Sequence, residues 1–180
     1  MACVDLESRS CLVVGAGSVG LEKARGLLEC GAHVTVVAPR IAPELETLEV
    51  EVVQRGYRTR DLDGRFLVVA ATSDTALNRR VFREAEASSL LCNVVDVPEL
   101  CSFILPAVLR RDPIAIAVST GGASPALAQR IRDDISEVVG DEHAELALRL
   151  RELRPWVRER YPTYDERRQF FADLVANELS

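Results

Sequence analysis

The chain has 180 residues and a formal net charge of −6, and this acidic balance argues against nucleic-acid binding, which depends on clustered Lys and Arg. The start MACVDLESRS lacks a secretory signal and no apolar run approaches the roughly 18 residues of a membrane helix, so we expect a cytoplasmic protein without membrane contact. The five cysteines include no Cys-x-x-Cys pair, which argues against a disulfide framework and against a bound metal.

A glycine-rich turn follows the first predicted strand. Residues 12–14 form a short apolar run, which is typical of a parallel strand buried on both faces. The residues that follow, GAGSVG, match a Gly-x-Gly-x-x-Gly turn that opens a helix. Gly15 permits the tight turn, Gly17 lets a pyrophosphate approach the backbone, and Gly20 lets the helix pack closely on the strand. We therefore predict a dinucleotide site with its phosphates at the helix N-terminus.

The residues around the turn complete a strand–helix–strand unit. Helical spacing covers residues 18–29, and a second strand covers residues 33–37. This strand lacks the terminal Asp or Glu that binds ribose hydroxyls and ends instead in Pro39 and Arg40. Arg40 is suited to a 2′-phosphate, to stacking on adenine or to solvent, so the residues alone leave NAD and NADP both open. A Rossmann-like fold that binds no nucleotide is the alternative for the unit.

Three more predicted strands continue the pattern of a parallel sheet with helices between its strands. Residues 49–54 alternate apolar and polar side chains, and residues 66–70 and 90–94 are apolar runs. Asp74 is a suitable N-cap for a helix that runs to about residue 88. This order of elements predicts an α/β fold with a Rossmann-like parallel sheet.

Polar residues stand where the last two of these strands end. Thr72 and Ser73 are candidate contacts to ribose or nicotinamide, and the alternative is that they only cap the next helix. Asn93 and Asp96 lie at the exit of the following strand, where a Rossmann sheet presents groups to the nicotinamide. Asp96 is the candidate base, and the alternative is an Asp that caps the loop before Pro98.

The pattern changes near residues 101–106. Apolar stretches over residues 102–109 and 114–119 predict a strand pair with a polar turn, and the helical spacing of residues 141–180 predicts a small helical domain with breaks near Pro155 and Pro162. Between them, a second glycine turn leads into a helix that ends near residue 139. The residues around this turn are either a carboxylate-binding surface or an ordinary cap with solvated arginines: Arg110, Arg111, Thr120, Gly121, Gly122 and Ser124.

Four segments resemble a known family when they are taken together in this order: GAGSVGLEKARGLL, VVAATSDTALNRRV, CNVVDVPELCSFILPAVLRR and IAVSTGGASPALAQRIR. The family is that of the siroheme-synthase dehydrogenases, the precorrin-2 dehydrogenases, some of which are also sirohydrochlorin ferrochelatases. The resemblance covers residues 12–139 and is looser in the helical tail. It implies NAD-dependent oxidation of precorrin-2 to sirohydrochlorin, with ferrous iron as a further substrate in bifunctional members. Single-function dehydrogenases share most of these motifs, so iron insertion stays open.

The resemblance also implies an organisation and a site. It implies a Rossmann domain over residues 1–105, a dimerisation segment over 106–140 and a helical domain over 141–180, assembled as a homodimer. No methyltransferase domain follows, so we expect the stand-alone form. The resemblance makes Asp96 the catalytic aspartate, places the STGG turn near the tetrapyrrole, and assigns cofactor contacts to Ser18, Val19, Pro39 and Arg40. The alternative function is a non-catalytic NAD(H)-binding sensor module.

Overall fold

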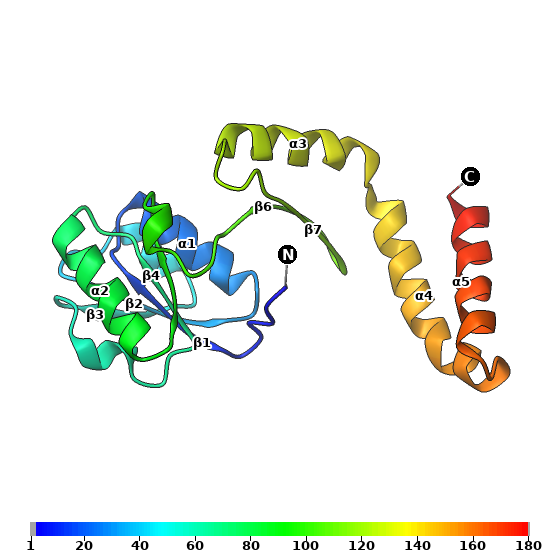
Figure 1. Cartoon of the computed structure of the whole chain (residues 1–180), viewed down its shortest axis with the longest axis horizontal. Coiled ribbons are helices and arrows are strands. Elements are labelled where there is room, and N and C mark those ends of the chain that lie inside the picture. Colours follow the sequence, from blue (N-terminus) through cyan, green and yellow to red (C-terminus); the bar gives the residue numbers. More distant parts are fainter. Residues whose placement is uncertain (1–2, 180) are drawn as a thin grey trace. The chain divides into compact units, whose positions relative to one another are not determined.

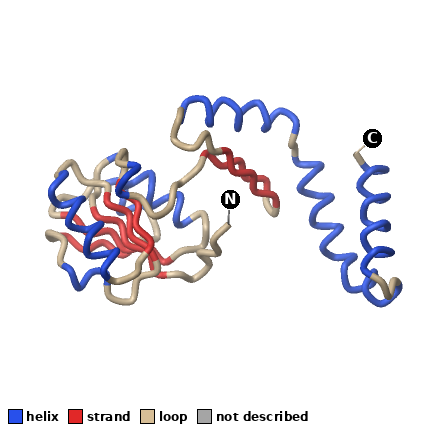
Figure 2. The backbone as a smooth tube through the Cα atoms, viewed as in Figure 1, coloured by secondary structure: helices blue, strands red, loops and turns tan. Residues whose placement is uncertain are grey.

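Five short parallel strands form one sheet in the order β3-β2-β1-β4-β5 (Figures 1 and 2). They are β1 (Ser10–Val14), β2 (His33–Ala38), β3 (Glu51–Gln54), β4 (Leu67–Ala70) and β5 (Leu91–Val94). The helices between them include α1 (Ser18–Leu28) and α2 (Thr75–Ala87). This computed structural model describes residues 3–179 and divides the chain into two compact units, with the division between Ile104 and Leu105. The sheet of the first unit confirms the predicted Rossmann-like α/β architecture.

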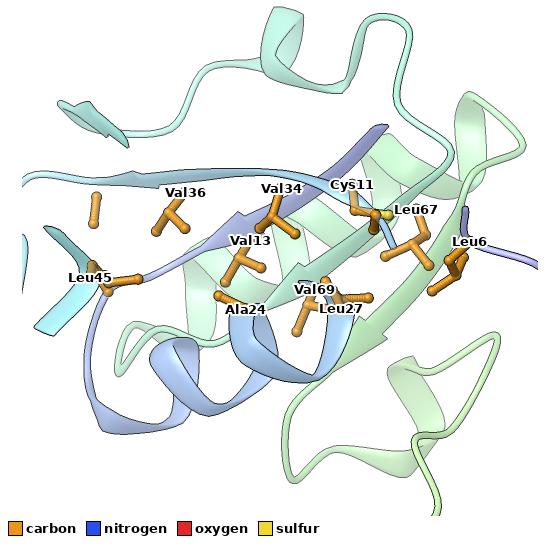
Figure 3. Close-up of a cluster of buried hydrophobic side chains, with 13 residues drawn as sticks. Leu6, Cys11, Val13, Ala24, Leu27, Val34, Val36, Leu45, Leu67 and Val69 are labelled. Atoms are coloured by element: carbon orange, nitrogen blue, oxygen red, sulfur yellow. The ribbon is translucent and has the colours of Figure 1, made fainter. Parts of the chain in front are cut away.

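Successive side chains of the central strands enter two different apolar layers, which is why these strands are mostly apolar. In β1, Cys11 and Val13 belong to the layer under α1, whereas Leu12 and Val14 belong to the layer under α2. Figure 3 shows the first of these layers, where the labelled strand residues lie against Ala24 and Leu27 of α1. The second layer is closed by three buried residues of α2 and β5, Val81, Ala85 and Cys92.

An ion pair between a half-buried arginine and a buried aspartate fixes the segment between β3 and β4. Asp61 is 8% exposed, and its two carboxylate oxygens accept hydrogen bonds from the Arg55 guanidinium at 2.6 and 2.8 Å. The backbone N–H of Arg58 donates a further bond of 2.8 Å to the same carboxylate. These donors, with Arg55 first among them, hold the pKa of Asp61 below its ordinary value of 3.8.

Replacing Asp61 by asparagine should therefore lower thermal stability and change its dependence on pH. The folded state has the lower pKa, so the stabilisation is complete above the unfolded value of 3.8 and is lost as the pH falls through the folded value. We expect Asp61→Asn to lower the Tm at pH 7 and to flatten its fall below about pH 4. Asp63→Asn, at an exposed position of the same segment, is the control. Equal Tm values for both variants would show that the Arg55–Asp61 pair does not stabilise the fold.

The second unit contains a two-stranded antiparallel sheet and three helices. The strands are β6 (Ala107–Arg111) and β7 (Ile114–Val118), and Arg111 pairs with Ile114 next to the turn. The helices are α3 (Pro125–Val138), α4 (Asp141–Arg160) and α5 (Tyr164–Glu178). Within this unit α3 packs on the strand pair, and α4 and α5 lie side by side (Figure 1). No helix within residues 3–179 is both long enough and apolar enough to cross a membrane.

Two expectations about this part of the chain are wrong. The first strand of the pair begins at Ala107 rather than at residue 102, because Ser102 is bonded to Cys92 of β5 through its backbone N–H, at 2.8 Å. The predicted break at Pro155 does not occur, since α4 continues through it. A proline inside a helix removes one hydrogen bond and crowds the preceding turn. Packing offsets that cost here: Val157, in the following turn, is fully buried, and the neighbouring Trp156 contacts aromatic rings of α5 and the preceding loop.

Candidate functional site

The carboxyl ends of four strands meet in register at one edge of the sheet. Val14 pairs with both Val37 and Ala70, and Ala70 pairs with Val94. The chain leaves β1 towards β2 on one side and returns to β4 on the other, so the order of strands reverses between β1 and β4. In open α/β sheets such a reversal is the place where ligands bind. The loops after β1, β2, β4 and β5 therefore surround one candidate binding site.

The glycine turn after β1 has the shape that the sequence predicts. Gly15 has a φ of +113°, and a Cβ there would collide with the backbone carbonyl of Ala71 in the neighbouring loop. A Cβ on Gly20 would collide with the carbonyl of Gly15, so α1 packs directly on the turn. At Gly17 a Cβ would meet nothing within 4 Å. Gly15 and Gly20 are thus required by the fold, whereas Gly17 leaves open space in front of the helix.

The N-terminus of α1 faces this site with free donors. Gly17 is the N-cap and makes no side-chain capping bond, and the first turn contains no acidic residue. The N–H groups of Ser18, Val19 and Gly20 have no partner inside the helix, because they belong to its first turn. Unpaired N–H groups and the positive end of the helix dipole attract phosphate. The residues present therefore fit a dinucleotide pyrophosphate, and the exposed Ser18 and Val19 lie where the sequence predicts cofactor contacts.

The loop after β4 is held by a buried amide that sequence reasoning missed. Asn78 of α2 is 6% exposed; its Oδ1 accepts from the Thr72 hydroxyl at 2.7 Å, and its Nδ2 donates to the Thr72 carbonyl at 2.9 Å. Asp74 is the cap of α2, as predicted, and accepts from two N–H groups of its first turn. Thr72 thus shapes the loop, and Ser73 is exposed at its tip. The sequence does carry a signal for Asn78, because it is a polar residue at helical spacing from the apolar residues Val81 and Ala85 on the buried face of α2.

Asp96 occupies an exposed turn directly after β5. Its φ is +61°, in the left-handed region, and the turn is closed by the Val97 N–H, which donates to the Val94 carbonyl at 3.2 Å. This conformation costs most residues other than glycine roughly 1–2 kcal/mol and Asp less than most, and such backbone strain collects at functional sites. Asn93 is 8% exposed and donates through Nδ2 to the Phe103 carbonyl at 2.9 Å. Asn93 thus supports the loop, and its role as a cofactor contact stays a prediction.

The thiols near Asp96 stay protonated at neutral pH. Burial raises the pKa of Cys92 to about 12, and burial also raises the pKa of Cys101 above its ordinary value. Within residues 3–179, no group of three or more His, Cys, Asp or Glu side chains is arranged to hold a metal ion. Asp96 presents an exposed carboxylate at the exit of β5, and its role as the base stays a prediction.

Arg40 lies beyond the end of β2, beside the glycine turn. The two loops are neighbours, because the Gly15 N–H donates to the Val37 carbonyl at 3.0 Å. Pro39 and Arg40 are both exposed, and no carboxylate stands at the end of this strand. The sequence-predicted residues that the structure brings to this edge are Gly15, Gly17, Ser18, Val19, Gly20, Pro39, Arg40, Thr72, Ser73, Asn93 and Asp96.

The second group of predicted residues belongs to the second unit. The Thr120 hydroxyl donates to the Ser124 carbonyl and accepts from the Ser124 N–H, both at 3.0 Å, while Ser124 Oγ caps α3 by accepting from Leu127 at 3.2 Å. Gly121 and Gly122 have φ values of +62° and +84°, so the turn between β7 and α3 needs glycine at both positions. On the hairpin before this turn, Arg110 is exposed and Arg111 is half-buried.

Comparison with known proteins agrees with the motifs. The family model described as "Putative NAD(P)-binding" matches residues 2–107, and the model described as "Sirohaem biosynthesis protein central" matches residues 111–137. The chain is 41% identical over 177 residues to a siroheme synthase of Ectopseudomonas mendocina and 42% identical over 174 residues to one of Thioalkalivibrio sulfidiphilus. These alignments cover 97% and 94% of the chain but only 38% and 36% of the relatives' length.

A solved structure resembles the chain over nearly its whole length. It is entitled "SirC, precorrin-2 dehydrogenase", and it has a TM-score of 0.80 and 27% sequence identity. The match covers 99% of this chain and 90% of that one. Together with the glycine turn and the register of its sheet, these matches show that the chain belongs to the NAD(P)-binding family that carries the sirohaem biosynthesis central segment, as its motifs predicted.

Proposed function

We propose that the protein oxidises precorrin-2 to sirohydrochlorin with NAD. The observation that carries the proposal is a strained, exposed Asp96 on the same sheet edge as a glycine turn built for a pyrophosphate. The relatives support the substrate, since the solved neighbour is entitled a precorrin-2 dehydrogenase and the curated relatives are siroheme synthases. The alternative of a non-catalytic sensor gives the exposed Asp96 no role.

In this proposal some residues of the sheet edge bind the cofactor, and Asp96 accepts a proton from the substrate. NAD supplies a hydride acceptor when it is bound. The N–H groups of Ser18 and Val19 bind the pyrophosphate, and the loop of Thr72 and Ser73 contacts the ribose or the nicotinamide. Oxidation of the macrocycle removes a hydride and a proton, and a carboxylate oxygen of Asp96 accepts that proton. Asp96 is exposed, so the proton passes on to solvent before the next turnover.

The residues of the second unit are proposed to bind the substrate's carboxylates. Precorrin-2 carries several acidic side chains, which need hydrogen-bond donors and positive charge. Arg110 and Arg111 of β6 supply charge, and Thr120, Gly121, Gly122 and Ser124 form the turn at the start of α3. The proposed contacts are backbone N–H groups of this turn and the two guanidinium groups.

We also propose that the protein acts as a homodimer in the cytoplasm. In the described part of the second unit only Leu109, Ala128, Leu146 and Val157 are buried apolar residues, which is a small core for this length of chain. Meanwhile α3 exposes Leu127 by 51% and Val138 by 70%. Apolar side chains of this kind are commonly covered by a partner. Light scattering after gel filtration should give twice the chain's mass, and a monomer would contradict the proposed dimer.

An anaerobic assay with precorrin-2 tests the activity. Sirohydrochlorin formation is followed by absorbance with NAD, with NADP and without nucleotide, and ferrous iron is added in a second step. We expect sirohydrochlorin only when nucleotide is present. Siroheme formation faster than in the enzyme-free control would add iron insertion, with iron as a substrate. A folded protein that binds NAD but turns over nothing would favour the sensor.

The position of Arg40 leads to a prediction about nucleotide choice. An Asp at the end of the second strand binds the ribose hydroxyls and repels a 2′-phosphate, whereas Arg accommodates it. We expect Arg40→Asp to raise the Kd for NADP about tenfold or more, since hydrogen bonds to charged groups contribute about 1.5–3 kcal/mol. The Kd for NAD should stay within about threefold. Arg168→Asp, the same charge change at an exposed position of α5, is the control. Parallel losses of NAD and NADP would contradict this role.

A further inference from the structure

The turn that carries Asp96 is held from outside by a thiol. Cys101 Sγ lies 3.2 Å from the Val94 carbonyl oxygen and 3.3 Å from that of Val97, so its one hydrogen is shared between two acceptors. These two carbonyls stand on either side of Asp96 in the chain. The thiol therefore links the beginning and the end of the turn, in addition to the long backbone bond of 3.2 Å from Val97 to Val94.

Cys101 is itself fixed to the sheet. It forms an isolated antiparallel bridge with Asn93, whose Nδ2 donates to the neighbouring Phe103 carbonyl at 2.9 Å and lies 3.5 Å from the Cys101 sulfur. Next to it, Ser102 Oγ accepts from the Cys92 N–H at 2.7 Å, and the Ser102 N–H donates to the Cys92 carbonyl at 2.8 Å. Because Cys101 is fixed to β5, the hydrogen bonds of its sulfur fix the turn relative to that strand.

The turn needs such support because its backbone is strained. Asp96, at φ +61°, occupies a left-handed conformation that Asp adopts more readily than most L-residues but that still costs more than the extended or right-handed regions. Relaxation of that φ would carry the carboxylate away from its place at the sheet edge. Burial raises the pKa of the Cys101 thiol, so it keeps the proton that it donates at neutral pH.

We propose that Cys101 is a positioning residue for the reaction, which acts by holding the Asp96 turn in its left-handed conformation. This inference rests on the proposed function, because it assumes that Asp96 takes part in turnover.

Three variants test this role by turnover. Cys101→Ala removes the donor and should lower kcat about 10- to 100-fold with KM nearly unchanged, because a misplaced catalytic group slows the reaction without weakening binding. Cys101→Ser restores a donor and should recover most of the lost kcat. Cys92→Ala is the matched control, since this buried thiol of β5 makes no hydrogen bond to the turn. An unchanged kcat in Cys101→Ala, or an equal loss in Cys101→Ser, would overturn the proposal.

Amide hydrogen exchange separates this proposal from the proposed function. The Val97 N–H closes the turn, so its exchange should accelerate in Cys101→Ala and return towards the wild-type rate in Cys101→Ser. The Gly15 N–H, bonded to the Val37 carbonyl, should not change and serves as the internal reference. A wild-type protein that is inactive on precorrin-2 contradicts the proposed function, while the exchange rates still decide whether the thiol holds the turn. Unchanged exchange at Val97 would overturn the inference whatever the activity.

Discussion

Replacement of Asp96 by asparagine is expected to lower kcat for precorrin-2 oxidation by about 10²- to 10⁴-fold, the usual contribution of a positioned acid–base group. The amide has the same size as the carboxylate but cannot accept the proton that leaves the macrocycle. Asn also tolerates the left-handed conformation at φ +61°, so the turn should keep its shape. The Kd for NAD and the Tm should therefore match those of the wild type, measured by calorimetric titration and thermal unfolding.

The strain at this position offers a second test of the same idea. Asp96→Gly removes the Cβ that makes a positive φ unfavourable, and this gain roughly offsets the 0.5–1 kcal/mol of entropy that glycine loses on folding. Stability should therefore stay within about 1 kcal/mol of the wild type while turnover is abolished, which is the behaviour of a residue kept for function. Glu99→Gln, at an exposed acid of the same loop, should change neither quantity. Turnover that survives in Asp96→Asn would remove Asp96 from the mechanism.

The sequence predicted the sheet edge because its signals are local. The central strands are short, mostly apolar runs, and Gly15 and Gly20 stand at fixed distances from the first one. Parallel strands necessarily bring their carboxyl ends to one edge, so residues as distant as Gly17 and Asp96 could be assigned to one site without any knowledge of contacts. The register of Val14 with both of its neighbouring strands agrees with this reasoning.

What the sequence missed depends on contacts between distant residues. Asn78 is an ordinary polar residue of a helix until its bonds to Thr72 are seen, and Cys101 is an ordinary apolar residue until its sulfur is found between two carbonyls. The wrong expectation at Pro155 has a similar cause. Local propensity favours a break there, but packing of the following turn against other parts of the unit decides the outcome.

A methyl group added at Gly17 should weaken the binding of NAD without lowering the stability of the fold. The backbone at Gly17 has a φ of −78°, which any residue adopts, and a Cβ there meets nothing within 4 Å. If the open space receives the pyrophosphate, that methyl collides with the ligand alone. A clash of about 1–3 kcal/mol corresponds to a Kd for NAD roughly 10- to 100-fold higher. Fluorescence titration of NAD and thermal unfolding of Gly17→Ala measure the two effects separately.

Two neighbouring glycines provide the controls that make this result interpretable. Gly20→Ala places its Cβ against the Gly15 carbonyl, so it should lose about 1–3 kcal/mol of stability before any question of binding arises. Gly26 lies inside α1 with nothing within 4 Å of an added Cβ, and Gly26→Ala should raise stability by about 0.5–1 kcal/mol and leave the Kd unchanged. If Gly17→Ala bound NAD as tightly as Gly26→Ala does, the nucleotide would not approach this turn. The proposed binding of the pyrophosphate by the N–H groups of Ser18 and Val19 would then be wrong as well.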